Sequence, residues 1–283
     1  AVIITPVSAT APGGIRVIRN SHESHFAEKV IFYLAVESEA TIERIALFHQ
    51  LVGEKVRVRE EITFTPARTV EVQYTWELKP GDLRPGVDVS YFWEIEDAAG
   101  NHLRTKPRVF SYDDDRFDWK SISQGQLTVY YYGATQRRAA EILTAASEAA
   151  QRLQNDIGIA LEHPVSIYVY NSKADMRAAL APRGGIYDSK TVTLGVARGG
   201  DTLLLLGSHD DALATVAHEM SHIIVGLATD NPYTELPRWL DEGLAMYAEG
   251  ELPPDNARAL QRAIRENRLI SVRSLSSYVG DPT

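Results

Sequence analysis

Two histidines and a glutamate stand at a spacing that can bind a metal ion. Residues 217–222 read AHEMSH, which places His218 and His222 four positions apart. On a helix, side chains at positions i and i+4 point the same way, with Cβ atoms about 5–6 Å apart, so two imidazoles can hold one ion. Glu219 follows the first histidine and can reach a water on that ion without binding the ion itself. The pattern is the His-Glu-x-x-His arrangement of zinc hydrolases.

A catalytic zinc needs a third protein ligand and an open fourth position. The chain has no cysteine, and Val225 and Ala228 stand where the metzincin extension needs glycine and histidine. Downstream, residues 236–247 read LPRWLDEGLAMY and offer Glu242, nineteen intervening residues beyond His222. That gap fits a loop and an antiparallel second helix that returns Glu242 to the histidines. Gly243, beside it, is expected to let the two helices approach closely.

Helices are expected around both motifs. Residues 211–227 carry a broad apolar stripe at helical spacing, and 237–250 begins with a proline that suits a first turn. Further helices are expected at 135–154, 174–180 and 256–268, and strands at 127–132, 164–170, 191–196 and 202–206. Strands followed by helices predict an α+β domain. The segment 202–206 (TLLLL) is either an edge strand that pairs with an extended peptide or a buried core strand.

The first 115 or so residues alternate apolar and polar side chains with the period of a strand. Strands are expected at 30–36, 45–47, 56–64, 70–78, 87–95 and 104–112. Strands with one apolar face pack as two antiparallel sheets around one core, and six or seven in this length favour an immunoglobulin-like or fibronectin-like all-β sandwich.

These patterns predict four consecutive parts of the chain. We expect a leader or flexible terminus at 1–14, the sandwich at 15–115, a linker at 116–126 and the second domain at 127–283. The acidic run 113–118 lacks the register of a calcium loop and is interpreted as solvated linker. The stretch 276–283 is turn-like, and we expect the second domain to continue past it.

Composition excludes several classes of protein. Against 38 Asp and Glu stand 29 Lys and Arg, and the net charge of −9 has the wrong sign for a nucleic-acid binder. No apolar run approaches the ~20 residues that a transmembrane helix needs. Residues 8–11 contain an Ala-x-Ala-like stretch, so we expect an extracytoplasmic or secreted protein.

The two motifs together resemble the gluzincin metallopeptidases, the thermolysin-like superfamily. The sequence Trp-Leu-Asp-Glu-Gly-Leu-Ala-x-Tyr at 239–247 is most similar to the aminopeptidase N-related and peptidase-MA-like branches. The resemblance implies a zincin fold, a peptide or protein substrate, and zinc held by His218, His222 and Glu242. It implies that Glu219 is the general base. The family also places an oxyanion donor well beyond the glutamate ligand, and Tyr278 is the aromatic candidate. The sandwich is similar to that of secreted or surface bacterial members.

The chain departs from the family in two places. Thermolysin braces a histidine with an aspartate four residues after the glutamate ligand, where this chain has Met246. It also lacks the Gly-x-Met-Glu-Asn motif with which aminopeptidases hold a free amine, so an endopeptidase is expected. Trp239 and Tyr247 are expected in the core. Two alternatives stay open: an inactive binding or adhesion protein that keeps the metallopeptidase frame, and a zinc hydrolase of non-peptide amides.

Overall fold

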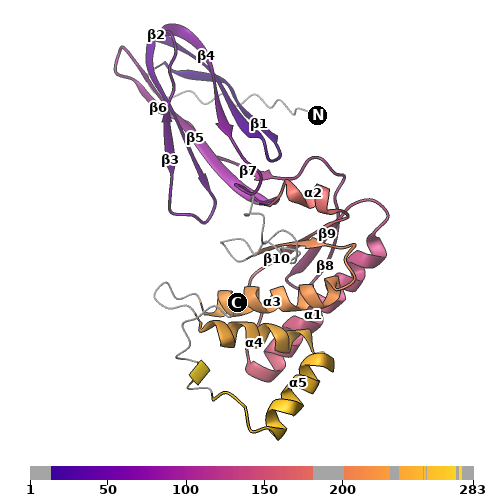
Figure 1. Cartoon of the computed structure of the whole chain (residues 1–283). Helices are drawn as coiled ribbons and strands as arrows, with labels where there is room; N and C mark the ends of the chain where they lie inside the picture. Colours follow the sequence, from indigo (N-terminus) through magenta and orange to yellow (C-terminus); the bar gives the residue numbers. More distant parts are fainter. Residues whose placement is uncertain are drawn as a thin grey trace. The chain divides into compact units, whose positions relative to one another are not determined.

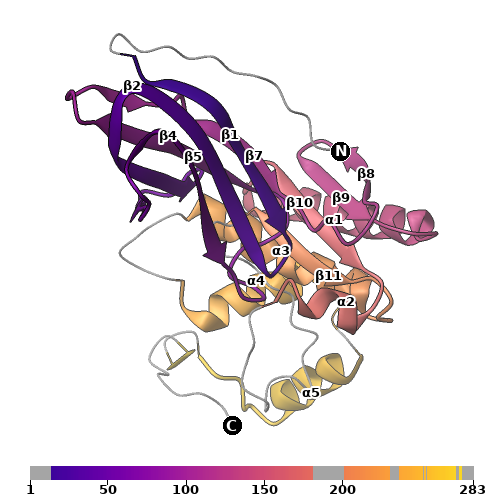
Figure 2. The ribbon, with the colours of Figure 1, turned by 90° about the horizontal axis from the view of Figure 1, so that it is seen from above.

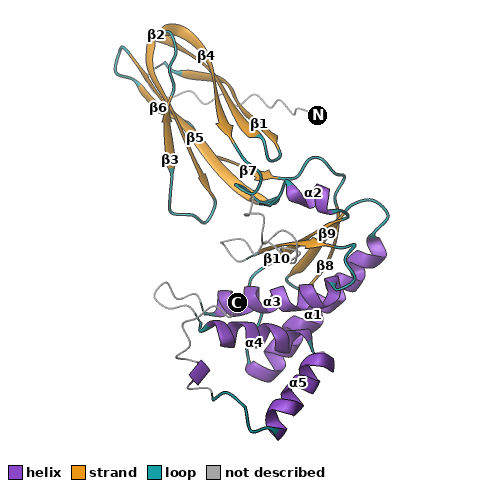
Figure 3. Cartoon of the chain, in the orientation of Figure 1, coloured by secondary structure: helices purple, strands orange, loops and turns teal. Residues whose placement is uncertain are grey.

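The chain divides into two compact units. A computed structural model describes residues 14–180, 201–229, 236–250, 252, 254–271 and 274–275. One unit comprises Ala1–Phe117 with Arg177–Gly184, and the other comprises Asp118–Met176 with Gly185–Thr283. Strands dominate the first unit and helices the second (Figure 3). The predicted order, an antiparallel β region followed by an α+β region, is confirmed.

Within its described residues the first unit has seven strands, whose pairings are antiparallel. They are β1 (Arg16–His25), β2 (Lys29–Leu51), β3 (Val58–Glu61), β4 (Ala67–Glu77), β5 (Val87–Asp97), β6 (His102–Arg104) and β7 (Arg108–Tyr112). Three differ from expectation. Strand β1 was not expected, the expected strands 30–36 and 45–47 are one continuous strand, and the expected strand 104–112 is divided into β6 and β7.

The long strand β2 takes part in two layers. Up to Glu37 it pairs with β1 and β4, and beyond Ile42 it pairs with β3 and β5, with register shifts between. The rings of Phe32 and His49 lie 5.9 Å apart although the two residues are seventeen positions apart in the sequence. A straight strand of that length would span about 55 Å. The strand therefore folds over at the register shift, and its two halves face each other.

Aromatic side chains fill the space between these layers. The ring of Phe32 lies 4.9 Å from that of Tyr91 on β5, and His22 on β1 stacks on Phe110 of β7 at 3.8 Å. Phe32, Tyr91 and Trp93 are wholly buried. These contacts explain the period-two pattern of the sequence, because alternate side chains of each strand point into the shared core.

Asp97, the last residue of β5, is hydrogen-bonded to the segment of β2 where that strand bends. Its carboxylate accepts hydrogen bonds from Ser38 Oγ at 2.6 Å and from Asn101 Nδ2 at 3.0 Å. The backbone amides of Ala99 and Asn101 donate to its other oxygen at 3.0 Å. These bonds, led by those from Asn101 and Ser38, lower the pKa of Asp97 to about 2. The side chain is thus a charged acceptor that fixes the turn after β5.

The described part of the second unit contains a sheet of four strands in the order β11-β10-β9-β8. Its strands are β8 (Lys120–Gln124), β9 (Leu127–Tyr131), β10 (Val165–Tyr170) and β11 (Thr202–Leu206). Strands β9, β10 and β11 are parallel, and β8 runs antiparallel at the edge. All five side chains of β11 are buried, which accounts for the unbroken apolar run TLLLL. Among the described strands β11 lies at the edge of the sheet beside β10, and its side chains are buried, so the structure agrees with one feature of each interpretation of 202–206.

Helices flank the sheet of the second unit. They are α1 (Gln136–Ile157), α2 (Lys173–Arg177), α3 (Ala212–Ala228), α4 (Arg238–Glu249) and α5 (Pro254–Arg265). Helix α3 packs against α1, α4 and β11. In Figure 1, α1 and α3 lie along one side of the sheet with α4 beyond them, and Figure 2 shows α3 beside β10 and β11. None of the described helices is long and apolar enough to cross a lipid bilayer.

The segment expected to be a solvated linker is structured. Residues 116–126 include β8, and Trp119 packs edge-on against Tyr132 of the second unit with ring centres 5.0 Å apart. In the acidic run before it, Asp114 is buried and paired with Arg116. The segment therefore includes an ordered strand, while most of its side chains are exposed, as are Asp113, Asp115 and Asp118 of the acidic run. Residues 8–11, 191–196 and Tyr278 lie outside the described residues.

Candidate metal centre

Helix α3 carries both histidines on one side. Its apolar residues, among them Val216, Met220 and Ile223, are fully buried. The side chains of His218 and His222 keep 24% and 19% of their surface exposed, and their rings lie 4.9 Å apart. The amphipathic pattern that predicts this helix thus also fixes the direction of the imidazoles, toward a partly open site beside the core.

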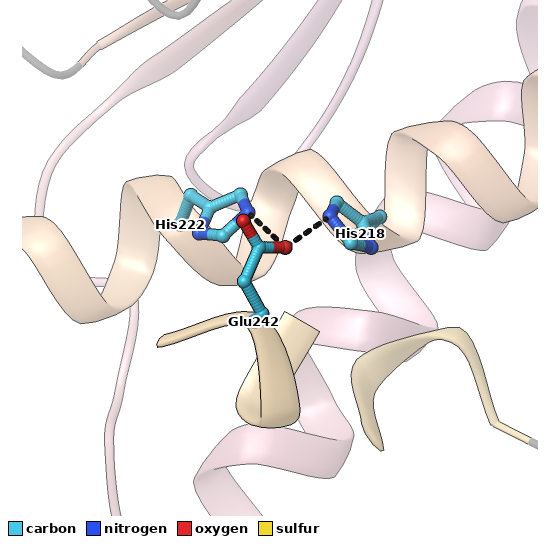
Figure 4. Close-up of side chains that lie close together, drawn as sticks. All are labelled: His218, His222 and Glu242. Atoms are coloured by element: carbon cyan, nitrogen blue, oxygen red, sulfur yellow. Dashed lines mark ion pairs between the residues drawn. The ribbon is translucent and has the colours of Figure 1, made fainter. Parts of the chain in front are cut away.

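Helix α4 brings Glu242 to these histidines. Its Oε2 lies 3.5 Å from His218 Nε2 and 4.0 Å from His222 Nε2. One ligand atom from each residue lies within 4.8 Å of the others, so a single ion can contact all three. Figure 4 shows the carboxylate of Glu242 between the two imidazoles. The structure therefore brings together the three residues that the sequence predicts as ligands.

Small side chains and two polar contacts hold α4 in place. Its buried residues are Ala245 and Ala248, whose size suits close helix packing. Arg152 of α1 donates to the carbonyl of Ala248 at 2.6 Å, and Tyr247 donates to Asp156 at 2.7 Å. The hydroxyl of Tyr247 thus contacts α1. Its side chain was expected in the core but is about half exposed. That expectation was wrong because a tyrosine can bridge two helices at their surface.

The expected role of Gly243 is also wrong. The residue is exposed, and a Cβ added there would meet no atom within 4 Å. The close approach of α3 and α4 therefore depends on the buried alanines two and five residues further along, Ala245 and Ala248. Trp239 is only half-buried, on the first turn of the same helix.

Two further carboxylates contact the histidines from the other side. Glu249 Oε1 lies 2.7 Å from His218 Nδ1, and Asp241 Oδ1 lies 3.1 Å from His222 Nδ1. Neither carboxylate was predicted from the sequence, in which only Met246, at the position of thermolysin's bracing aspartate, was considered. Helical spacing carried a signal for one of them, because Glu249 follows Glu242 by seven residues, or about two turns.

Glu219 lies in a setting that favours its protonated form. Burial raises the pKa of its carboxyl, and the nearby charges of Glu242 and Asp241 raise it further, whereas His218 and His222 oppose them. A carboxylate whose pKa is shifted toward neutrality accepts and returns a proton more readily than an ordinary one. Such a group suits the role of general base that the resemblance implies.

The donor set fits a divalent metal with borderline character. Two imidazole nitrogens and one carboxylate oxygen are the ligands that zinc takes in many hydrolases. The carboxylates of Glu219, Asp241, Glu242 and Glu249 gather around the site. The cation paired with Glu242 is Arg238, whose Nε lies 3.9 Å from Oε1 and whose side chain is 76% exposed. A bound cation would offset this negative charge.

Comparison with known families covers the part of the chain that holds this site. Residues 145–282 match the sequence profile of the Peptidase MA superfamily, so the second unit carries a Peptidase MA domain with a His218/His222/Glu242 metal-binding triad. No curated protein shows significant similarity to the chain.

Similarity to solved structures is slight. A crystal structure of a bromine derivative of BhCBM56 has 12% identity and a TM-score of 0.26, over 37% of this chain and 97% of that one. A crystal structure of catalytically inactive OgpA from Akkermansia muciniphila with an O-glycopeptide substrate has 10% identity and a TM-score of 0.28, over 38% and 31%. Astrotactin-2, a vertebrate-specific perforin-like membrane protein, has 11% identity and a TM-score of 0.29, over 93% and 37%. Likeness at this level indicates neither fold nor activity.

Proposed function

We propose that this protein is a zinc-dependent metallopeptidase that cleaves peptide bonds within a chain. The observation that carries the proposal is the triad of His218, His222 and Glu242 on two packed helices of a Peptidase MA domain. Two imidazoles and a carboxylate leave an open coordination position, which a catalytic zinc requires.

The residues around the triad supply the remaining chemistry. Bound zinc would lower the pKa of a coordinated water to about 7 and polarise the scissile carbonyl. Glu219 takes the proton of the attacking water and returns it to the leaving amine. Its raised pKa supports both halves of this exchange, because the protonated form must persist until the amine departs. Tyr278 is our candidate for the donor to the developing oxyanion.

We propose an endopeptidase rather than an aminopeptidase because one sequence motif of the related aminopeptidases is absent. No Gly-x-Met-Glu-Asn motif precedes the zinc helix, so this chain lacks the acidic group with which related aminopeptidases hold a substrate's amine. We also propose an extracytoplasmic location, supported by the Ala-x-Ala-like stretch at 8–11.

Metal analysis and a cleavage assay test this function. The purified chain should contain about one zinc, and His218→Ala, His222→Ala and Glu242→Ala should each lose it, since each deletes a ligand. The matched control is His102→Ala, in the β unit, where a histidine with 68% of its side chain exposed is removed. Full zinc retention in both α3 variants would sink the assignment.

The same preparations separate the alternatives. An internally quenched peptide library should be cleaved by the zinc-loaded chain, and a chelator should abolish cleavage until zinc is restored. Zinc binding without cleavage of any substrate would favour the binding or adhesion protein. Cleavage confined to acylated amines that are not peptides would favour the amide hydrolase.

A further inference from the structure

We propose that Glu249 and Asp241 are positioning residues that hold the two ligand imidazoles by their Nδ1 atoms, so that both present Nε2 to the metal. The inference rests on the proposed metal site. In thermolysin an aspartate braces a histidine ligand, but this chain has Met246 at that position, so other residues must take this role.

The two histidines have the same orientation relative to α4. The Nε2 atoms of His218 and His222 face Glu242 Oε2, at 3.5 and 4.0 Å. Their Nδ1 atoms face the carboxylates of Glu249 and Asp241, at 2.7 and 3.1 Å. A neutral imidazole has one N–H, and a carboxylate can only accept. Carboxylates face both nitrogens of each ring, and those at Nδ1 lie closer, so in a neutral imidazole Nδ1 carries the hydrogen and Nε2 keeps the lone pair that a metal requires.

The geometry of two antiparallel helices explains why the two carboxylates are so far apart in sequence. His218 and His222 are separated by about 6 Å along α3, at 1.5 Å per residue. His218, nearer the start of α3, meets Glu249 at the end of α4, whereas His222 meets Asp241 in the first turn of α4. Glu242 faces the space between the two imidazoles (Figure 4). One helix thus supplies a ligand and both braces.

The contacts that hold α4 against α1 lie next to Glu249, the carboxylate with the shorter distance to its histidine. Tyr247 and the carbonyl of Ala248 bind Asp156 and Arg152, immediately before Glu249. The side chain of Glu249 is 24% exposed, so it holds His218 in a partly dry environment. A charge-assisted hydrogen bond is stronger there than at a fully exposed surface.

Conservative variants test the proposal through metal affinity. Glu249→Gln and Asp241→Asn keep the shape and the ability to accept a hydrogen bond but remove the negative charge. We expect zinc affinity, measured by competition with a chromophoric chelator, to fall about 10–100-fold in each variant. Glu249→Asp retains the charge and should recover part of the loss. Glu148→Gln, an exposed carboxylate of α1 outside the site, controls for the change in net charge.

A spectroscopic readout distinguishes positioning from simple helix packing. Long-range proton–nitrogen spectra of the zinc-loaded chain with ¹⁵N-labelled histidine should show both ligands as Nδ1–H tautomers with metal on Nε2. Glu249→Ala should alter the Nδ1 signal of His218 and leave that of His222 in place. Coordination through Nδ1 of either histidine would overturn the proposal.

The outcomes also separate this inference from the proposed function. Retention of zinc by His218→Ala and His222→Ala would remove the metal site and the braces with it. Loss of zinc in those variants, with affinities of Glu249→Gln and Asp241→Asn within about twofold of the parent, would leave the function standing and overturn the positioning role alone.

Discussion

The two units of the chain both carry exposed ion pairs, such as Arg137–Glu141 in the second unit, but differ in where carboxylates gather. On the β unit, arginines face carboxylates: Arg16 pairs with Glu37, and Arg44 lies between Glu61 and Glu96. Exposed pairs of this kind contribute at most about 1 kcal/mol each and mainly keep the surface neutral. In the second unit, by contrast, carboxylates converge on one place. Groups of like charge repel one another unless a proton or a cation lies between them, so convergence indicates a binding site and pairing indicates a surface.

The largest expected effect is on the rate of hydrolysis, and it comes from changing a carboxylate of the converging group in the second unit. Glu219→Gln keeps the shape of the side chain but cannot accept the proton, so hydrolysis should fall by ~10²–10⁴ while zinc stays bound. Rates with a quenched peptide and zinc content on the same samples measure both. Glu61→Gln, which breaks a paired charge of the β unit, is the matched control and should leave the rate unchanged. Loss of zinc in Glu219→Gln with retention in Glu242→Ala would mean that the two carboxylates have exchanged roles.

An intermediate effect concerns the stability of the β unit. Leu34 is 1% exposed, and Leu34→Ala should lower the free energy of unfolding by about 2–5 kcal/mol through lost burial and a cavity. Denaturant unfolding followed by tryptophan fluorescence measures this loss, and Val109→Ala, at an exposed position of β7, should change it by less than about 0.5 kcal/mol. Zinc affinity should not change in either variant. A fall in zinc affinity with Leu34→Ala would show that the site depends on the β unit.

A fragment of the second unit provides a related test. It should begin at Asp118 rather than at residue 127, because the later start would delete β8 and Trp119. We expect this fragment to retain zinc. An unfolded fragment would contradict the separation of the two units.

The smallest effect concerns Asp97, a buried carboxylate of the β unit that accepts hydrogen bonds from neutral donors. Hydrogen bonds lower the pKa of Asp97 to about 2, against 3.8 for the free side chain. Its contribution to stability is therefore complete above about pH 4 and is lost as the pH falls toward 2. Asp97→Asn should destabilise the chain less than Leu34→Ala does at pH 7, and the difference from the parent should shrink between pH 4 and pH 2.5. A difference that is constant over this range would contradict the assignment.

The sequence predicted what depends on local periodicity. Alternating residues located most strands of the β unit, and the apolar runs at 164–170 and 202–206 located β10 and β11 within a residue. The two histidines were predictable because i, i+4 spacing depends only on one helix, and Glu242 was predictable because the gap after His222 fits a loop and a returning second helix. The continuity of β2 was not predictable, because the polar residues 37–44 resemble a loop and only pairing with distant strands holds them extended.

The braces of the histidines were missed for a comparable reason. Their contact with α3 depends on how two helices cross, and that crossing is set by Ala245, Ala248 and the contacts of α4 with α1. No pattern within one helix contains this information. Spacing could bring Glu249 to the face of Glu242, but it could not say which ring nitrogen each carboxylate would meet.

The path of β2 through both layers has a consequence for how the β unit can change in length during evolution. Within either half of β2, inserting or deleting one residue would turn the following side chains from the core face to the solvent face. Because β2 pairs with strands of both layers, an insertion in its first half would also reverse the side chains of its second half. Residues 39–41, which lie in the register shift and follow the Ser38 that binds Asp97, can absorb a change that the paired halves cannot. We therefore expect length variation among homologues to gather there and at residues 52–57, and to be rare at 30–36 and 45–50.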